Sequence, residues 1–200
     1  MVRILFLCVG NLGRSRIAEA VAKRYRNNRV EVMSAGTWLS SYISPEERKR
    51  RLMKAAEIFG VNPRGKTEKQ LFDEIRGKVL RINEQVIEAL REREIEISGK
   101  EPKMLESWML KWADIIVTLA PEAAADLPRT EIKEKTVIHW DIKDPFHLPI
   151  EEVRAIRDEI EESLAREGVK ALRTEGDSLS GWVLLDFGDV IVLSLIHISE

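Results

Sequence analysis

Cysteine and histidine are scarce in this 200-residue chain, which has one of the former and three of the latter. The single cysteine, Cys8, excludes an internal disulfide framework and is typical of proteins from a reducing compartment. The three histidines lie far apart in the sequence, which argues against a zinc site. We therefore expect no metal, no cofactor and a cytoplasmic location.

The chain also lacks a strong charge bias and any long apolar run. Its formal net charge is -2 with 33% charged residues, so a nucleic-acid partner is not expected. No segment reaches the roughly 18 apolar residues of a membrane span. The apolar start, Val2 to Leu7, is too short for a signal peptide and has no cleavage site. A hydrophobic content of 44% supports one core domain, which we expect to be a monomer or weak dimer without a membrane partner.

The most informative segment is Cys8 to Ser15, with the sequence CVGNLGRS, between a buried apolar strand and a helical pattern. Backbone N–H groups in such a loop and at a helix N-terminus form an anion-binding cradle. We expect Gly10 and Gly13 to give the loop its positive φ angles. The residues predicted to contact phosphate are Val9, Gly10, Asn11, Leu12, Gly13, Arg14 and Ser15.

Cys8 is predicted to be a nucleophile within this cradle, because the same N–H donors and helix dipole favour a thiolate over a thiol. Arg14 can bind two phosphoryl oxygens in a bidentate fork. Ser15 can donate its hydroxyl to the sulfur. The alternative is a buried structural cysteine, which would leave the glycines, the arginine and the helix start unexplained.

Cys8 to Ser15 fits the C-x5-R-S loop of the low-molecular-weight protein tyrosine phosphatases, and further motifs follow in the family's order. These motifs are Ala18-Glu19-Ala20, Ser34-Ala35-Gly36-Thr37, Ala113-Asp114-Ile115-Ile116 and Asp144-Pro145. The chain resembles this family over residues 1–166, with a poorly matched middle. The resemblance implies an α/β fold, a doubly wound, mostly parallel sheet of about four strands with helices on both faces.

Hydrophobic patterns place the elements of this fold. They predict strands at 2–7, 30–34, 114–119 and 136–140 and helices at 15–25, 45–59, 103–112, 121–127 and 149–166.

The resemblance also implies roles for residues outside the loop. Ser34 would brace the loop through Asn11, and the alternative is a plain turn serine. Trp38, Tyr42 and Phe146 would wall the pocket and stack on an aromatic ring, and the alternative for the first two is ordinary core packing.

Asp144, followed by Pro145, is predicted to be the general acid that protonates the leaving group and then the base that activates water. Asp141 is a competing candidate that lacks the following proline. Two departures from the family are Arg16, where proline is usual, and Phe146, where tyrosine is frequent.

The implied activity is that of a cysteine-dependent protein tyrosine phosphatase acting on a phosphotyrosine protein or a small phosphomonoester. One alternative is an arsenate reductase that uses an external thiol, because one cysteine cannot support an internal disulfide relay. Another is a non-catalytic phosphate-binding or ribosome-associated regulator.

Residues 66–100 depart from the family pattern. Apolar residues from Leu71 to Leu90 recur at helical spacing and predict one long helix, or two helices broken near Gly77. We interpret 66–100 as a helical insertion that covers the active site, pairs with another subunit or lies along the core.

Residues 167–200 do not match the phosphatase family. Trp182 to Asp189 resemble part of the ribosomal silencing factor (Iojap-like) family and predict a β-hairpin of 181–186 and 189–195, with Phe187-Gly188 at the turn. Residues 193–200 resemble a translated sequencing-adapter read-through, so we expect the terminus to be an artefact and the tail a chimera.

Overall fold

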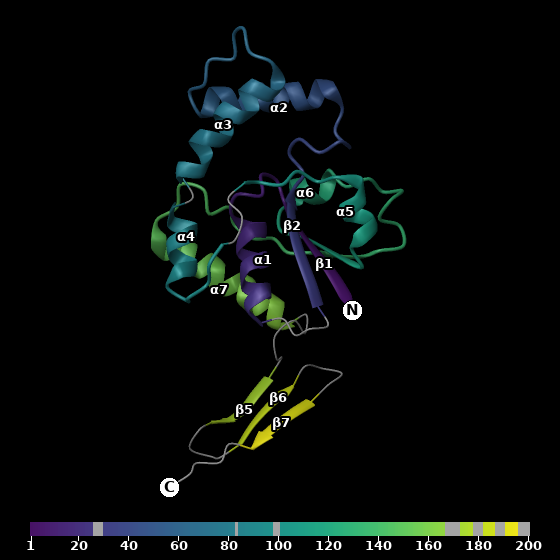
Figure 1. The fold of residues 1–200 in the computed structure, drawn as a ribbon, viewed down its shortest axis with the longest axis vertical. Helices are drawn as coiled ribbons and strands as arrows, with labels where there is room; N and C mark the ends of the chain where they lie inside the picture. The colour runs from purple at the N-terminus through teal and green to yellow at the C-terminus, as the bar shows by residue number, and fades with distance from the viewer. Residues whose placement is uncertain are drawn as a thin grey trace.

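The computed structural model describes residues 1–25, 30–82, 84–97, 101–166, 173–177, 182–186 and 191–195. Its centre is a parallel four-stranded sheet in the order β2-β1-β3-β4 (Figure 1). The strands are β1 (Val2–Cys8), β2 (Val30–Gly36), β3 (Ile115–Thr118) and β4 (Thr136–His139). This order confirms the predicted doubly wound α/β class.

Strand β1 lies between two strands and is buried on both faces, as its unbroken apolar sequence predicts. Side chains alternate across a strand, so Phe6 and Cys8 pack into one core cluster. Leu5 and Leu7 pack into a second cluster on the other face. The strand therefore ends with Cys8 at the boundary between the core and the loop that follows.

Helices cover both faces of the sheet. The helices α1 (Arg14–Tyr25) and α7 (Ile150–Arg166) contact each other and share the core cluster that contains Phe6. The shorter helices α5 (Ser107–Trp112) and α6 (Pro121–Ala125) contact the sheet, and α5 supplies the other cluster. The inner face of α7 carries Val153, Ile156, Ile160 and Leu164, which are all buried.

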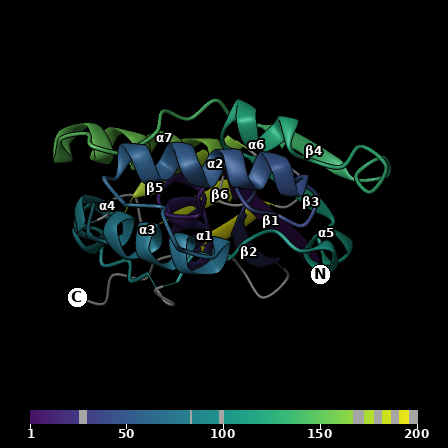
Figure 2. The ribbon, with the colours of Figure 1, turned by 90° about the horizontal axis from the view of Figure 1, so that it is seen from above.

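Helices α2 (Pro45–Ile58) and α3 (Glu68–Ile82) pack on each other. Both lie over the end of the sheet at which β1 and β2 finish (Figures 1 and 2). The Ser44 hydroxyl accepts a hydrogen bond from the Glu47 backbone N–H at 3.2 Å, which caps α2 as its sequence predicts. A third apolar cluster joins the two helices to Leu12 and Phe146.

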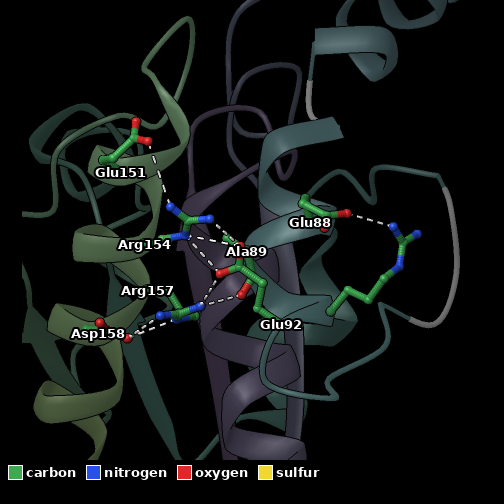
Figure 3. A network of polar contacts seen from close by, with 8 residues as sticks. Glu88, Ala89, Glu92, Glu151, Arg154, Arg157 and Asp158 are labelled. Atoms are coloured by element: carbon green, nitrogen blue, oxygen red, sulfur yellow. Dashed lines mark hydrogen bonds and ion pairs between the residues drawn. The ribbon is translucent and has the colours of Figure 1, made fainter.

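Helix α4 (Glu84–Arg91) packs on α7 instead. Figure 3 shows the polar contacts between them: Arg154 and Arg157 on α7 donate to Glu92, and Arg157 also donates to the Ala89 carbonyl oxygen. The predicted helical segment is therefore two helices, but α3 ends at Ile82 and α4 begins at Glu84, and Gly77 lies inside α3. Helix α3 reaches the end of the sheet, and α4 lies along the core.

The helix predicted at 103–112 starts later, at Ser107. The preceding residues are extended because Gly36 at the end of β2 bonds to them: its N–H donates to the Lys103 carbonyl at 2.7 Å, and its carbonyl accepts from Leu105 at 2.8 Å. Trp108 on this helix is exposed, and its indole N–H donates to Glu106 Oε2 at 3.0 Å.

The tail contains an antiparallel sheet of β5 (Arg173–Asp177), β6 (Trp182–Asp186) and β7 (Ile191–Leu195). The β6–β7 pair confirms the predicted hairpin, and β5 is an unpredicted third strand. The proposed turn residues, Phe187 and Gly188, and the last residues, 196–200, lie outside the described residues. The domain boundaries, the status of 66–100 as an insertion and the adapter origin of 193–200 stay predictions.

Candidate active site

The loop between β1 and α1 surrounds the sulfur of Cys8. The Asn11 backbone N–H donates to Cys8 Sγ at 3.2 Å, and Ser15 Oγ lies 3.0 Å from the same sulfur. Cys8 itself is buried. A backbone N–H donor and a hydroxyl thus lie within hydrogen-bond distance of the sulfur.

Asn11 holds the loop in shape. Its backbone has a φ of 55°, in the left-handed region that asparagine tolerates better than most residues. Its side-chain amide nitrogen donates to Ser15 Oγ at 3.0 Å and to Ser34 Oγ at 2.8 Å. Its amide oxygen accepts from the Lys103 N–H at 2.8 Å. The left-handed residue of this loop is therefore Asn11, and the expectation that Gly10 and Gly13 would supply positive φ was wrong.

Two glycines are required by close approach instead. A Cβ atom on Gly13 would lie 2.6 Å from Pro145 Cγ, and a Cβ atom on Gly36 would lie 2.7 Å from the Val9 carbonyl oxygen. Gly13 thus lets the segment carrying Asp144 pack on the loop. Gly36 lets the end of β2 pack beneath the loop.

Arg14 and Asp144 meet above the loop. Arg14 Nη2 donates to Asp144 Oδ2 at 2.9 Å, and Arg14 Nη1 donates to the Ile142 carbonyl oxygen at 3.2 Å. The Arg14 side chain is 10% exposed, whereas that of Asp144 is 59% exposed. Asp144 Oδ1 also accepts from the Phe146 N–H at 3.1 Å, which fixes the carboxylate beside the arginine. Asp141, the competing acid, is exposed and does not line the cavity described next.

A cavity of about 370 Å³ opens over the loop. Its polar base contains Cys8 and Arg14, and its walls are largely apolar. Trp38 and Phe146 line it, as predicted, and Phe146 packs edge-on against the Phe59 ring at a centroid distance of 5.5 Å. The full lining comprises Cys8, Val9, Gly10, Leu12, Gly13, Arg14, Trp38, Arg51, Lys54, Ala55, Ile58, Phe59, Ile75, Asp144 and Phe146.

Tyr42 does not reach this cavity, contrary to the predicted wall. The turns between Thr37 and Ile43 direct it to the cluster on the other face of the sheet. Its hydroxyl donates to Glu131 Oε2 at 2.5 Å. Burial and the bond to the Glu131 carboxylate raise the pKa of Tyr42 to about 12. Trp38 and Tyr42 were both predicted to wall the pocket, but only Trp38 lines the cavity and Tyr42 packs on the other face of the sheet.

Glu19, a residue without a predicted role, lies behind the loop. Ser34 Oγ donates to Glu19 and accepts from Asn11, so the carboxylate is connected to the loop through one hydroxyl. Burial by itself would raise the pKa of Glu19, but hydrogen bonds from Lys23 and Ser34 and the Lys103 charge hold that pKa below its usual value. The Ala18-Glu19-Ala20 motif is the feature of the sequence that could have pointed to a role for Glu19.

A second unpredicted network supports the cavity wall. Arg51 on α2 donates to both carboxylate oxygens of Asp126 at 2.8 Å, and Thr37 Oγ1 donates to Asp126 at 2.8 Å. The bidentate bond to Asp126 raises the pKa of Arg51 above its ordinary value. These contacts fasten α2 to the chain beside the loop. Although Arg51 belongs to the basic sequence of α2, its side chain is only 21% exposed.

No group of three or more His, Cys, Asp or Glu side chains that could hold a metal ion occurs among the residues described. None of the helices described is long and apolar enough to cross a membrane.

Comparison with known families gives a match over most of the chain. The family model described as low molecular weight phosphotyrosine protein phosphatase matches residues 3–75 and 76–177. A protein named arsenate reductase from Brevibacillus brevis is 31% identical over 157 residues, which cover 78% of this chain and 87% of the relative. The resemblance of the tail to a silencing factor gains no support from these findings.

Solved structures share the fold at low sequence identity. A mutant of the arginine phosphatase YwlE, with a phosphorylated active site serine, aligns with a TM-score of 0.54 at 22% identity, covering 82% of this chain and 91% of that one. A low molecular weight protein tyrosine phosphatase from T. tengcongensis aligns with a TM-score of 0.51 at 20% identity, covering 80% and 93%. Proteins with three differently named activities therefore resemble this chain.

Proposed function

The chain belongs to the low molecular weight phosphotyrosine protein phosphatase family, and we propose that it hydrolyses phosphomonoesters, protein phosphotyrosine above all, through a phosphocysteine on Cys8. One observation carries this proposal. Cys8, Arg14 and Asp144 line a single cavity whose remaining walls are mostly apolar and aromatic. A phosphoryl group fits the polar base and an aromatic ring fits the walls.

In the first step, the Cys8 thiolate attacks phosphorus and the bond from phosphorus to the leaving oxygen breaks. Loop N–H groups and Arg14 hold the equatorial oxygens, where charge is spread in the transition state. Asp144, protonated, gives its proton to the leaving oxygen. The product alcohol departs and phosphocysteine remains.

In the second step, the Asp144 carboxylate takes a proton from water, and the water oxygen attacks phosphorus. The sulfur–phosphorus bond breaks, and inorganic phosphate and the Cys8 thiolate are released. The Ser15 hydroxyl, 3.0 Å from Sγ, stabilises the departing sulfur by donating to it. The chain's own side chains supply the nucleophile, the acid and the base for both steps.

The walls support an aryl phosphate as substrate. Trp38, Phe59 and Phe146 offer ring faces and edges to a phenyl group, and such contacts contribute about 0.5–1.5 kcal/mol per pair beyond area burial. A small oxyanion would leave these walls without contacts.

The test is hydrolysis of para-nitrophenyl phosphate and of phosphotyrosine and phosphoarginine peptides, with chelator present, by wild type, Cys8→Ser and Asp144→Asn. We expect chelator-resistant turnover that is lost in Cys8→Ser and reduced in Asp144→Asn, with phosphotyrosine preferred. Turnover that survives in Cys8→Ser would contradict the mechanism, and a preference for phosphoarginine would contradict the substrate.

Arsenate reduction is a second candidate, which the name of the Brevibacillus brevis relative supports. The Cys8 thiolate would displace an oxygen of arsenate to form a sulfur–arsenic bond. An external thiol would then attack the sulfur, so that arsenite leaves and a mixed disulfide forms, and a second external thiol would regenerate Cys8. With one cysteine in the chain, both electrons must come from external thiols.

Thiol-dependent formation of arsenite distinguishes the two candidates. If arsenate is reduced with glutathione while aryl phosphates are not hydrolysed, the reductase is the correct assignment. If the folded protein binds phosphate and turns over neither substrate, the non-catalytic alternative holds.

A further inference from the structure

One face of α2 forms a wall of the cavity. Arg51, Lys54, Ala55 and Ile58 all line it. Their spacing of three, four and seven residues places them along one side of the helix. The basic sequence of α2 therefore contributes charge to the cavity as well as to the outer surface.

The two cations of this face differ in their partners. Arg51 is paired with Glu47 at 2.8 Å and with Asp126 at 2.8 Å, so its charge is largely compensated. Lys54 is exposed and makes no ion pair with any residue in the described part of the chain. Glu57, three residues further along α2, is exposed and is not paired with it.

The residues that line the cavity differ in kind between its base, its walls and its opening. Arg14, 10% exposed, lies at the base with Cys8. Trp38 and Phe146 line the walls, and the exposed Lys54 lies at the opening. When an aromatic ring occupies the walls and its phosphate the base, the attached polypeptide leaves past the exposed lining residues, which are Lys54, Ile58 and Asp144. Lys54 is the cation among them.

We propose that Lys54 is a specificity residue that pairs with an aspartate or glutamate next to the phosphotyrosine of a peptide substrate. This inference rests on the proposed function and narrows its substrate class to phosphotyrosine in an acidic sequence. The pair forms only with a peptide, because a small aryl phosphate does not extend to the opening. Such a partly exposed pair changes affinity about two- to fivefold and weakens with salt.

The test uses two phosphotyrosine peptides that differ only by glutamate or glutamine beside the phosphotyrosine. Hydrolysis of both is measured for wild type, Lys54→Gln and Lys54→Glu, with para-nitrophenyl phosphate as the small substrate. Lys49→Gln is the matched control, because Lys49 is an exposed lysine of the same helix that does not line the cavity. Binding of the same peptides to Cys8→Ser proteins, with and without the Lys54 changes, is measured by fluorescence polarisation.

We expect wild type to prefer the glutamate peptide about two- to fivefold, through KM, and Lys54→Gln to lose that preference. Lys54→Glu should reverse it and Lys49→Gln should keep it, with each preference taken as the ratio of the two peptides within one variant. A preference that persists in Lys54→Gln, or is lost equally in Lys49→Gln, would overturn the inference.

The binding measurement separates this inference from the proposed function. Lys54-dependent binding to the Cys8→Ser protein, without turnover by wild type, would leave the inference standing and refute the phosphatase proposal. Turnover of para-nitrophenyl phosphate together with no binding of either peptide would refute the inference alone.

Discussion

Arg14 Nη2 donates to Asp144 Oδ2 at 2.9 Å, so the proposed phosphate ligand and the proposed general acid are each other's partners. A phosphoryl dianion needs the same guanidinium. We therefore expect substrate binding to break this ion pair and to free the Asp144 carboxyl group for proton transfer to the leaving oxygen. The bond from Arg14 to the Ile142 carbonyl oxygen does not involve Asp144 and can hold the arginine in position.

Asp144→Asn should bind inorganic oxyanions more tightly than wild type does, because Arg14 no longer has to break an ion pair with a carboxylate before it binds the anion. We expect the inhibition constant for phosphate to fall by up to about fivefold, the range of an exposed ion pair. The measurement is competitive inhibition of para-nitrophenyl phosphate hydrolysis.

Asp141→Asn is the matched control for this change, because Asp141 is an exposed aspartate three residues away that lines no part of the cavity. Its inhibition constant should equal that of wild type. Equal inhibition constants in Asp144→Asn and wild type would show that the ion pair does not compete with the anion.

Ser34→Ala should slow turnover without changing the aromatic walls. The substitution removes an acceptor of Asn11 and a donor to Glu19, so the loop loses a brace behind Cys8. We expect kcat to fall about tenfold, as small displacements of positioned groups do. Steady-state kinetics of the folded variant measure this change in kcat. An unchanged kcat would mean that Ser15 and Lys103 hold Asn11 in place without Ser34.

Glu19 should make the fold sensitive to acid. Its pKa is lowered in the folded state from a value of 4.5, so the unfolded chain binds more protons and folding stability falls as the pH drops below that value. Above it, the contribution is fully present. Thermal unfolding from about pH 7 to about pH 3 should therefore show a smaller loss of stability in Glu19→Gln than in wild type. Parallel profiles would remove Glu19 as a source of acid sensitivity.

Substitutions of Trp38 and of Tyr42 should have different effects on catalysis. Trp38→Leu removes a wall of the cavity, and we expect KM for aryl phosphates to rise about fivefold. KM for an alkyl phosphate should be unchanged.

Tyr42→Phe removes the hydrogen bond to Glu131 on the other side of the sheet. We expect unchanged kinetics and a loss of stability of about 1 kcal/mol. A rise in KM in Tyr42→Phe would restore Tyr42 to the substrate wall.

The sheet and the loop could be predicted because their signals are local. The central strand β1 is an apolar run buried on both faces, and the loop combines Cys8, glycines and Arg14 within eight consecutive residues. The segment with Asp144 could be placed because it follows the last strand of a parallel sheet, and the carboxyl ends of such strands share one edge. The choice of Asp144 within it rests on the resemblance of Asp144-Pro145 to the family motif.

The remaining features depend on contacts between distant segments. The delayed start of α5 results from the pairing of Gly36 with Met104, which no periodicity in 103–112 reveals. The requirement for glycine at position 13 comes from Pro145, more than a hundred residues away. Whether the Lys54 charge is compensated depends on the ion-pair partners of Asp126 and Glu47. Both of these carboxylates pair with Arg51.

The most direct test of the central claim is acid-quenched mass analysis of the Cys8 peptide during turnover of para-nitrophenyl phosphate by Asp144→Asn. This substrate has a good leaving group, so phosphocysteine should form readily, while its hydrolysis lacks a base. We expect a burst of nitrophenol and a phosphoryl group on Cys8. Steady turnover with Cys8 never phosphorylated would contradict it.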